Sequence, residues 1–344
     1  MKAHSWCTKC KKATSERCWE CGKLFCDSHL KPSKRRDPIW KVCDNCEVSH
    51  MSEPLVYRAN IKTAKGNQYA FALGHKCFGF GWQVDGGTTG MEWEHYRKAA
   101  EKQYGKNPAW SRYMTVIHQN LAPGDFIWTR DDVASFYLGR IASRWHYAAE
   151  KEYENADLAN ICDCEWVGPY TLDDVPGSLM QCRGPFRIVT DERLVEYTKL
   201  LYCEATAIRY APRNSDGPPN LFKWLSDSAC EDLVALYLQQ ELGYSIIPST
   251  SKHSTAKYEF AMIQRESGEE AAVQVKNGST SLHCPDYASA GFKVYLFTSA
   301  GEYKGDIPPN VETLAQDKLL DFATEHRSSL PKTIRRWVNY LYSQ

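Results

Sequence analysis

The C-terminal third of the chain alternates between helical and strand-like patterns of hydrophobic residues. Between Phe222 and Leu242 apolar side chains recur at helical spacing over a wide face, and Gly243 supplies a stop signal. Short apolar runs with the length and composition of strands then cover 244–248, 258–263, 271–276 and 292–298. Helical spacing returns over 311–325 and 334–342. This order predicts an α/β domain around a mixed sheet.

Residues 55–190 have a different pattern, in which short apolar runs are interrupted by Gly and Pro. The runs at 69–74, 125–130 and 135–141 predict strands, because they are short and rich in aromatic or β-branched residues. Residues 92–104 have the spacing of a helix. Many short strands around one or two helices predict a small β-barrel.

The first fifty residues are governed by the spacing of metal ligands rather than by hydrophobic periodicity. Seven of the 14 cysteines lie there, and with one histidine they form four pairs: Cys7 with Cys10, Cys18 with Cys21, Cys26 with His29, and Cys43 with Cys46. Zinc takes four nitrogen or sulfur ligands, so these eight residues predict two structural Zn²⁺ ions. A segment this short buries too little apolar surface to fold without metal.

Two stretches that interrupt regular structure divide the chain, one at 50–54 and one at 211–219, which is rich in Pro and Gly. A length of 344 residues also exceeds the ~100–200 residues of one ordinary domain. We therefore expect a multidomain α+β protein with a metal knuckle at 1–50, a β-rich domain at 51–210 and an α/β domain at 220–344.

Composition narrows the classes of function. Lys plus Arg number 42, as do Asp plus Glu, so a generally basic coat for nucleic acid is excluded, although residues 1–50 carry 11 basic against 6 acidic side chains. No run of about 18 apolar residues predicts a transmembrane helix. The N-terminus lacks the apolar stretch of a secretion signal. We expect a cytoplasmic protein whose cysteines are thiols or metal ligands.

The segment from Cys18 to His29 resembles B-box, FYVE and related cross-brace zinc fingers. In those folds the first and third ligand pairs share one metal, and the second and fourth pairs share another. The resemblance implies one site of Cys7, Cys10, Cys26 and His29, and a second of Cys18, Cys21, Cys43 and Cys46. The basic run 31–36 either faces phosphates or forms a solvated loop.

The middle domain resembles the PUA-like superfamily, especially EVE and YTH-type domains, over about 130 residues. The similarity lies in the motifs at 78–82, 121–128, 137–141, 164–167 and 176–179. In that superfamily an aromatic pocket receives a single base, often a modified one, by stacking and by contacts to its polar edge. The resemblance implies Trp82 and Trp128 as pocket walls and Asp85 as an acceptor for a base amino group.

The C-terminal domain resembles the PD-(D/E)xK nuclease superfamily, and its Mrr-type restriction endonuclease branch in particular. The matching residues are Glu231 on the first helix, Glu259 on the second strand, and Gln274 and Lys276 on the third. The family usually has Asp at the position of Glu259 and a carboxylate at that of Gln274, although Mrr-type members carry Gln-x-Lys. Residues 274 and 276 share one face of a strand, so both side chains are expected to enter one cleft.

Each residue has a role implied by that resemblance. Glu259 would bind a catalytic Mg²⁺, or Mn²⁺ in its place, with Gln274 and the Val275 carbonyl helping to hold it. Lys276 would hold the attacking water and offset charge at the phosphorane. Glu231 would be a secondary ligand or would orient the others.

Together these features predict a modification-dependent, type IV-like DNA endonuclease that reads a flipped modified cytosine and acts in anti-phage defence. Because cutting both strands needs two active sites, a homodimer on DNA is expected. Two alternatives remain open. One is a non-catalytic sensor or adaptor with a vestigial nuclease fold and a protein-binding finger, and the other is an RNA-directed factor.

Overall fold

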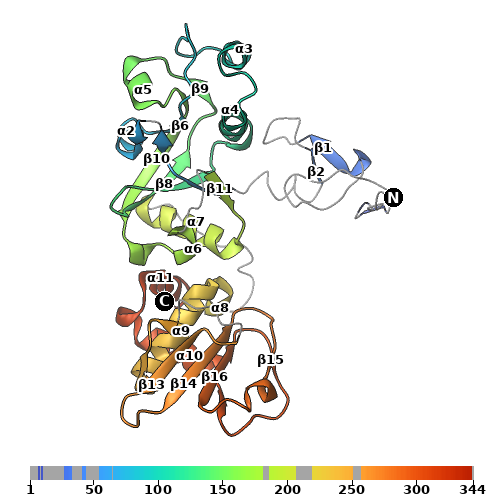
Figure 1. The fold of residues 1–344 in the computed structure, drawn as a ribbon, viewed down its shortest axis with the longest axis vertical. Coiled ribbons are helices and arrows are strands. Elements are labelled where there is room, and N and C mark those ends of the chain that lie inside the picture. The colour runs from blue at the N-terminus through green and yellow to red at the C-terminus, as the bar shows by residue number, and fades with distance from the viewer. Residues whose placement is uncertain are drawn as a thin grey trace. The chain divides into compact units, whose positions relative to one another are not determined.

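The computed structural model describes residues 7, 9–10, 27–32, 41–43, 54–63, 65–180, 186–206, 219–250 and 257–342 (Figure 1). They form a mixed α+β protein, which confirms the predicted class. The chain divides into two compact units, residues 1–169 with 182–190, and residues 170–181 with 191–344. Among the described residues, no helix is both long and apolar enough to cross a membrane.

The first unit is built on a curled seven-stranded sheet that forms a half-barrel (Figure 1). Its spatial order is β11 (Phe186–Val189), β3 (Val56–Ala59), β7 (Phe126–Arg130), β8 (Phe136–Ile141), β10 (Asn160–Tyr170) and β6 (Cys77–Phe80), with β9 (His146–Tyr147) paired to β10. β3 and β7 run parallel, whereas β11 and β3, β7 and β8, and β10 and β6 are antiparallel.

Helices connect these strands and share their hydrophobic core. They are α2 (Tyr69–Gly74), α3 (Trp93–Tyr104), α4 (Pro108–Met114), the π-helical turn η2 (Thr115–Asn120) and α5 (Lys151–Ala156), and a small hairpin joins β4 (Lys62–Thr63) to β5 (Gly66–Asn67). The core includes Phe78, Tyr96, Ile117 and Tyr147, all at most 2% exposed. The helix expected at 92–104 and the strands expected at 125–130 and 135–141 are thereby confirmed.

The strand predicted at 69–74 is wrong, because these residues form helix α2. Ala72 N–H donates to the Gln68 carbonyl at 3.0 Å and His75 N–H donates to the Phe71 carbonyl at 2.9 Å, as in a helical turn. Of this helix only Ala72 is fully buried. A run of six residues is too short for its apolar pattern to distinguish one helical turn from a buried strand.

The second unit contains a five-stranded mixed sheet, as expected (Figure 1). Its order is β12 (Tyr244–Ile246), β13 (Phe260–Gln264), β14 (Glu270–Lys276), β16 (Lys293–Thr298) and β18 (Val311–Thr313). β14, β16 and β18 run parallel, whereas β12 and β13 are antiparallel to their neighbours. Five consecutive residues of β14 are buried, which is typical of a central strand covered on both faces.

Helices make up much of the rest of this unit, and a second, two-stranded sheet pairs β15 (Leu282–His283) with β17 (Tyr303–Lys304). The helices are η3 (Leu172–Asp174), α6 (Gly177–Met180), α7 (Glu192–Thr206), α8 (Leu221–Trp224), α9 (Asp227–Gln240), η5 (Cys284–Tyr287), α10 (Gln316–Glu325), η6 (Arg327–Ser329) and α11 (Lys332–Tyr342). α9 packs against β12 and β14. This contact places one face of α9 beside the central strand.

Two predicted helices differ in their bounds. The helix expected at 222–242 is divided at Leu225, and Ser226 caps α9 through its Oγ atom, which accepts from Ala229 N–H at 3.1 Å. The helix expected from Val311 begins only at Gln316. Val311–Thr313 forms β18 instead, because it pairs with β16, a partner that local spacing does not reveal.

The boundary between the units differs from the one predicted at residue 210. η3, α6 and α7 belong to the second unit, where Arg193 forms an ion pair with Asp227 at 2.8 Å and Arg336 forms one with Asp174 at 2.8 Å. These ion pairs join the segments around 174 and 193 to α9 and α11. The predicted linker at 211–219 lies almost wholly outside the described residues.

Candidate functional site

A carboxylate, an amide and a lysine meet at one end of β14 in the second unit, and a second carboxylate lies near enough to interact with them electrostatically. Glu259, just before β13, continues the ladder, because its N–H donates to the Val273 carbonyl at 2.8 Å. Its Oε1 atom accepts from Gln274 Nε2 at 2.8 Å and from Lys276 Nζ at 3.2 Å. The structure therefore brings together the strand residues that the sequence placed in one cleft.

Glu231 joins this cluster from the second turn of α9. Burial raises the pKa of its carboxyl to about 7, and the nearby charge of Glu259 adds to the effect, while Lys276 opposes it. The Glu231 carboxyl is therefore close enough to interact electrostatically with both Glu259 and Lys276. Gln274 is 2% exposed, whereas the side chains of Lys276 and Glu259 are 40% and 24% exposed and can reach a ligand.

The loop after β14 is tied to the surrounding elements. Asn277 Nδ2 donates to the Leu225 carbonyl at 2.8 Å, at the junction between α8 and α9. Ser299 donates through Oγ to Asn277 Oδ1 at 2.6 Å, and its N–H donates to the Lys276 carbonyl at 3.0 Å. These bonds fix the end of β14 relative to the start of α9, so the four side chains are held by regular elements.

The donor set suits a hard divalent cation. Glu231, Glu259 and the carbonyl groups of Gln274 and Val275 offer oxygen ligands, which Mg²⁺ prefers. Glu231 and Glu259 lie near one cation of the described residues, Lys276, and the pKa of Glu231 is raised first by burial and then by the charge of Glu259. The amide nitrogen of Gln274 now faces Glu259, so its oxygen would have to turn toward an ion.

We expect the Glu231 carboxyl to make the stability of the folded protein depend on pH. Because its folded pKa lies near 7, above its ordinary value of 4.5, its stabilising contribution is complete below pH 4.5 and is lost as pH rises through 7. Glu231→Gln should therefore raise the free energy of unfolding by about 1–2 kcal/mol at pH 8 and change little at pH 4.5. Denaturant titrations at the two pH values would measure this, and equal effects at both would contradict it.

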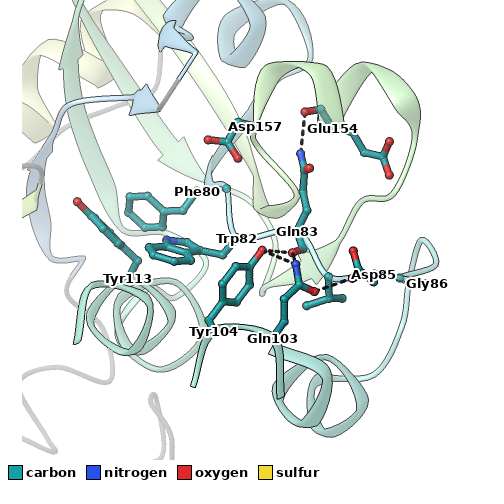
Figure 2. Close-up of a pocket in the computed structure, with 13 residues that line it drawn as sticks. Phe80, Trp82, Gln83, Asp85, Gly86, Gln103, Tyr104, Tyr113, Glu154 and Asp157 are labelled. Carbon is teal, nitrogen blue, oxygen red and sulfur yellow. Dashed lines mark hydrogen bonds between the residues drawn. The ribbon is translucent and has the colours of Figure 1, made fainter. Parts of the chain in front are cut away.

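A cavity of about 660 Å³ opens in the first unit (Figure 2). Aromatic side chains line one side of it, namely Phe80, Trp82, Tyr104 and Tyr113. Polar residues complete the lining, namely Gln83, Asp85, Gln103, Asp157 and Glu154, which presents its backbone carbonyl to Gln83 Nε2. The residues come from β6 and the loop after it, from α3 and α4, and from the end of α5. This mixture of an aromatic wall and a few polar groups is typical of small-molecule sites.

The cavity wall contains two residues in the left-handed backbone region. Trp82 has φ 66° and Asp157 has φ 54°. The conformation is uncommon for any non-glycine residue and most unfavourable for a bulky one such as Trp82. Two hydrogen bonds hold Trp82 in place, since its carbonyl accepts from Tyr96 Oη at 2.9 Å and from Asn160 Nδ2 at 3.4 Å. Such strain clusters at functional sites and supports a binding role for this wall.

The structure places two of the three residues predicted for a base pocket at this cavity. Trp82 and Asp85 line the cavity, but Trp128 does not, because it lies in β7 and is 2% exposed. The Trp128 side chain is instead buried in the core. Sequence reasoning missed Gln103, Tyr104 and Asp157, which lie far from Trp82 along the chain and carry no motif. The only local feature that could have pointed to Gln103 and Tyr104 is their position at the end of the helix expected at 92–104.

A third group lies near the N-terminus. Ligand atoms of Cys7, Cys10 and His29 lie within 4.8 Å of one another, so this group could hold a metal ion. The Cys7 Sγ and His29 Nδ1 atoms are 3.6 Å apart. Cys18, Cys21, Cys26, Cys46 and the Cys43 side chain fall outside the described residues, as does most of the basic run 31–36. Cys43 belongs by its backbone to β2 (Lys41–Cys43), which pairs with β1 (Leu30–Pro32) after the short helix η1 (Asp27–His29).

Comparison of the chain with protein-family models, with curated proteins and with solved structures gave no match.

Proposed function

We propose that this protein is a metal-dependent DNA endonuclease that acts on DNA carrying a modified base. The observation that carries the proposal is the hydrogen-bonded group of Glu259, Gln274 and Lys276 at one end of the mixed sheet, with the Glu231 carboxyl in electrostatic reach of it. A lysine beside two carboxylates, one of them with its pKa raised to about 7, suits phosphodiester hydrolysis assisted by a divalent cation.

Each residue of this group would have a separate role in the reaction. When bound, Mg²⁺ would act as a Lewis acid on the scissile phosphate, held by Glu259, Gln274 and the Val275 carbonyl. Lys276 is half-exposed, so its ammonium can turn from Glu259 toward the phosphate or the attacking water. There it would orient the water and offset the charge that develops on the phosphate oxygens. Glu231, as a carboxylate above pH 7, would orient the same cluster.

The cavity of the first unit supplies the modification-dependent part of the proposal. A flipped base is read by stacking on aromatic rings and by hydrogen bonds to its polar edge. Trp82 and Tyr104 offer rings whose centroids lie 5.1 Å apart at an angle of 86°, and Asp85 offers an acceptor. A modified cytosine with its exocyclic amino group fits this chemistry.

The Cys7, Cys10 and His29 group supports a zinc finger at the N-terminus, because thiolate and imidazole ligands favour Zn²⁺. We expect two Zn²⁺ ions per chain by elemental analysis of the purified protein. Cys10→Ser should reduce the content to one, and the matched change Cys203→Ser, in α7, should leave it at two. An unchanged zinc content in the first variant would contradict the assignment.

Cleavage of defined DNA tests the proposal directly. Linear duplexes carrying cytosine, 5-methylcytosine or 5-hydroxymethylcytosine would be incubated with the full-length protein and Mg²⁺, and again with Mn²⁺ or with EDTA. We expect cleavage of a modified substrate that EDTA abolishes. Cleavage of RNA in preference to DNA would show that the proposed substrate is wrong and that the protein is an RNA-directed factor. Lack of cleavage with either metal would favour a non-catalytic sensor or adaptor.

A further inference from the structure

A second lysine lies beside the hydrogen-bonded group at the end of β14. Lys257 precedes Glu259 by two residues. We propose that Lys257 binds a phosphate of the DNA backbone next to the phosphate that is cut. The inference rests on the proposed function, because it takes Glu259, Gln274 and Lys276 as the place of cleavage. It goes further by naming a residue that binds the substrate without taking part in the chemistry.

The register of β13 against β14 brings Lys257 to this end of the sheet. Phe260 pairs with Val273, and the Glu259 N–H donates to the Val273 carbonyl at 2.8 Å. In an antiparallel pair a step back along one strand is a step forward along the other, so Glu259 faces Gln274, to which it is hydrogen-bonded. Two residues earlier, in the turn that leads into β13, Lys257 comes to the level at which β14 ends.

A buried tyrosine holds the Lys257 side chain. The Lys257 Nζ atom lies 5.4 Å from the centre of the Tyr287 ring, which is the distance of a cation–π interaction. Tyr287 is 7% exposed, and its ring lies 6.0 Å from that of Tyr258, the residue between Lys257 and Glu259. Burial is the main cause that raises the pKa of Tyr287, and the charge of Glu259 is a smaller one. The same ring is therefore in reach of both the lysine and the carboxylate.

The Lys257 ammonium can bind a phosphate. Lys257 is exposed, and within the part of the chain that the structure describes it forms no ion pair with a carboxylate. An ammonium has three N–H donors, and contact with the face of a ring leaves donors that point away from the ring. Lys276, in contrast, already donates to Glu259 at 3.2 Å. Lys257 is thus the lysine whose donors are open to a ligand from solvent.

The charge of the site explains why such a lysine is needed. The carboxylates of Glu231 and Glu259 repel an approaching phosphate, whereas a cation beside them attracts it. Contacts of this kind position the DNA backbone and do not read the base. Because Tyr287 holds Lys257 to one side of Glu259, the ammonium meets a neighbouring phosphate of the strand rather than the scissile one. We therefore expect Lys257 to contribute to affinity and not to the rate of hydrolysis.

The salt dependence of DNA binding tests the contact. Fluorescence anisotropy of the full-length protein would use labelled duplexes carrying cytosine, 5-methylcytosine or 5-hydroxymethylcytosine, with Ca²⁺ in place of Mg²⁺ and electrophoresis to confirm that the DNA is uncut. Each phosphate contact contributes about 0.9 to the slope of log affinity against log salt concentration. Lys257→Ala should lower the magnitude of that slope by about 0.9 and weaken binding about fivefold at about 0.1 M salt, equally for the three duplexes.

Two variants control this measurement. Lys257→Arg keeps the positive charge and should keep the slope of the wild type. Lys293→Ala removes a lysine that also lies over a tyrosine ring, with Nζ 4.9 Å from the centre of Tyr295, but at the opposite end of the sheet. Its slope and affinity should stay close to those of the wild type. An unchanged slope in Lys257→Ala, or an equal loss of slope in Lys293→Ala, would overturn the inference.

A neutral phosphate locates the contact along the strand. Once the cleavage position is mapped, the phosphates on either side of it would be replaced one at a time by methylphosphonate, which carries no charge. At the contacted position the wild type should lose the affinity that Lys257→Ala loses, and the two changes together should cost no more than either alone. Fully additive losses at both positions would place the contact elsewhere and overturn the assignment to a neighbouring phosphate.

Cleavage kinetics separate this inference from the proposed function. With Mg²⁺, Lys257→Ala should raise KM about fivefold and keep kcat within about twofold, because it removes binding that ground state and transition state share. Binding without cleavage, with the slope still lowered in Lys257→Ala, would support the contact and overturn the endonuclease proposal. Cleavage by the wild type with an unchanged slope in the variant would do the reverse. Failure of the wild type to bind any of the duplexes would overturn both.

Discussion

Replacing Lys276 with alanine should lower the rate of DNA cleavage by about 10²–10³-fold, because a positioned charge that stabilises the transition state is removed. Lys276 Nζ lies 3.2 Å from Glu259 Oε1 at the open end of β14. Lys276→Ala removes the only cation identified in this cluster of described residues. Single-turnover cleavage of a modified duplex with saturating Mg²⁺ would measure the effect on the chemical step rather than on binding.

The same sheet offers a matched control. Lys293 begins β16 and forms an ion pair with Glu312 at 2.7 Å, and β14 pairs with β16 so that Lys293 lies beside Ala271, at the opposite end from Lys276. Lys293→Ala breaks an exposed ion pair worth about 0–1 kcal/mol and should leave cleavage nearly unchanged. Equal loss in the two variants, or full activity in Lys276→Ala, would remove Lys276 from the proposed chemistry.

Asp174→Asn should destabilise the second unit by about 3 kcal/mol, because it leaves the Arg336 charge partly uncompensated in a buried setting. The Asp174 carboxylate is nearly buried and accepts from Arg336 Nη2 at 2.8 Å, Lys332 Nζ at 3.2 Å and Thr171 N–H at 2.9 Å. Burial alone would raise its pKa, but the Thr171 and Arg336 hydrogen bonds hold that pKa well below its usual range.

Thermal and denaturant unfolding would measure this change, which corresponds to a fall in Tm of about 10 °C for a unit of this size. Because the folded pKa is depressed, the contribution of Asp174 is complete above about pH 4 and is lost as pH falls further. The difference between wild type and variant should therefore shrink at low pH. Asp173→Asn, which affects an exposed carboxylate 3.0 Å from Lys332 N–H, is the control and should cost under about 1 kcal/mol.

The sequence predicted which strand side chains meet at the end of β14, because their positions follow from a local pattern. Gln274 and Lys276 are two residues apart on a strand, so the strand period alone places them on one face. Adding Glu259 required only the next strand of the antiparallel pair. Val311 shows the limit of this reasoning, because its strand depends on pairing with β16, and a run of three residues has no pattern of its own.

The cavity was less accessible to sequence reasoning. Trp82 and Trp128 occupy comparable contexts in the sequence, at the ends of apolar runs, yet one lines a cavity and the other is buried in the core. The difference comes from the loop after β6, where Trp82 adopts a positive φ. Asp157 joins the site from about 75 residues away along the chain, and such an approach follows from tertiary packing rather than spacing.

The order in which the chain visits the two units has a consequence for synthesis on the ribosome. Residues 170–181 belong to the second unit, yet the chain then returns to place β11 beside β3 in the first. The half-barrel therefore lacks its edge strand until residue 189 has emerged, after part of the second unit is already made. A fragment ending at residue 169 would expose the edge of β3, and an exposed strand edge can pair with other chains and cause aggregation. A fragment of the first unit for expression should therefore extend at least to Thr190.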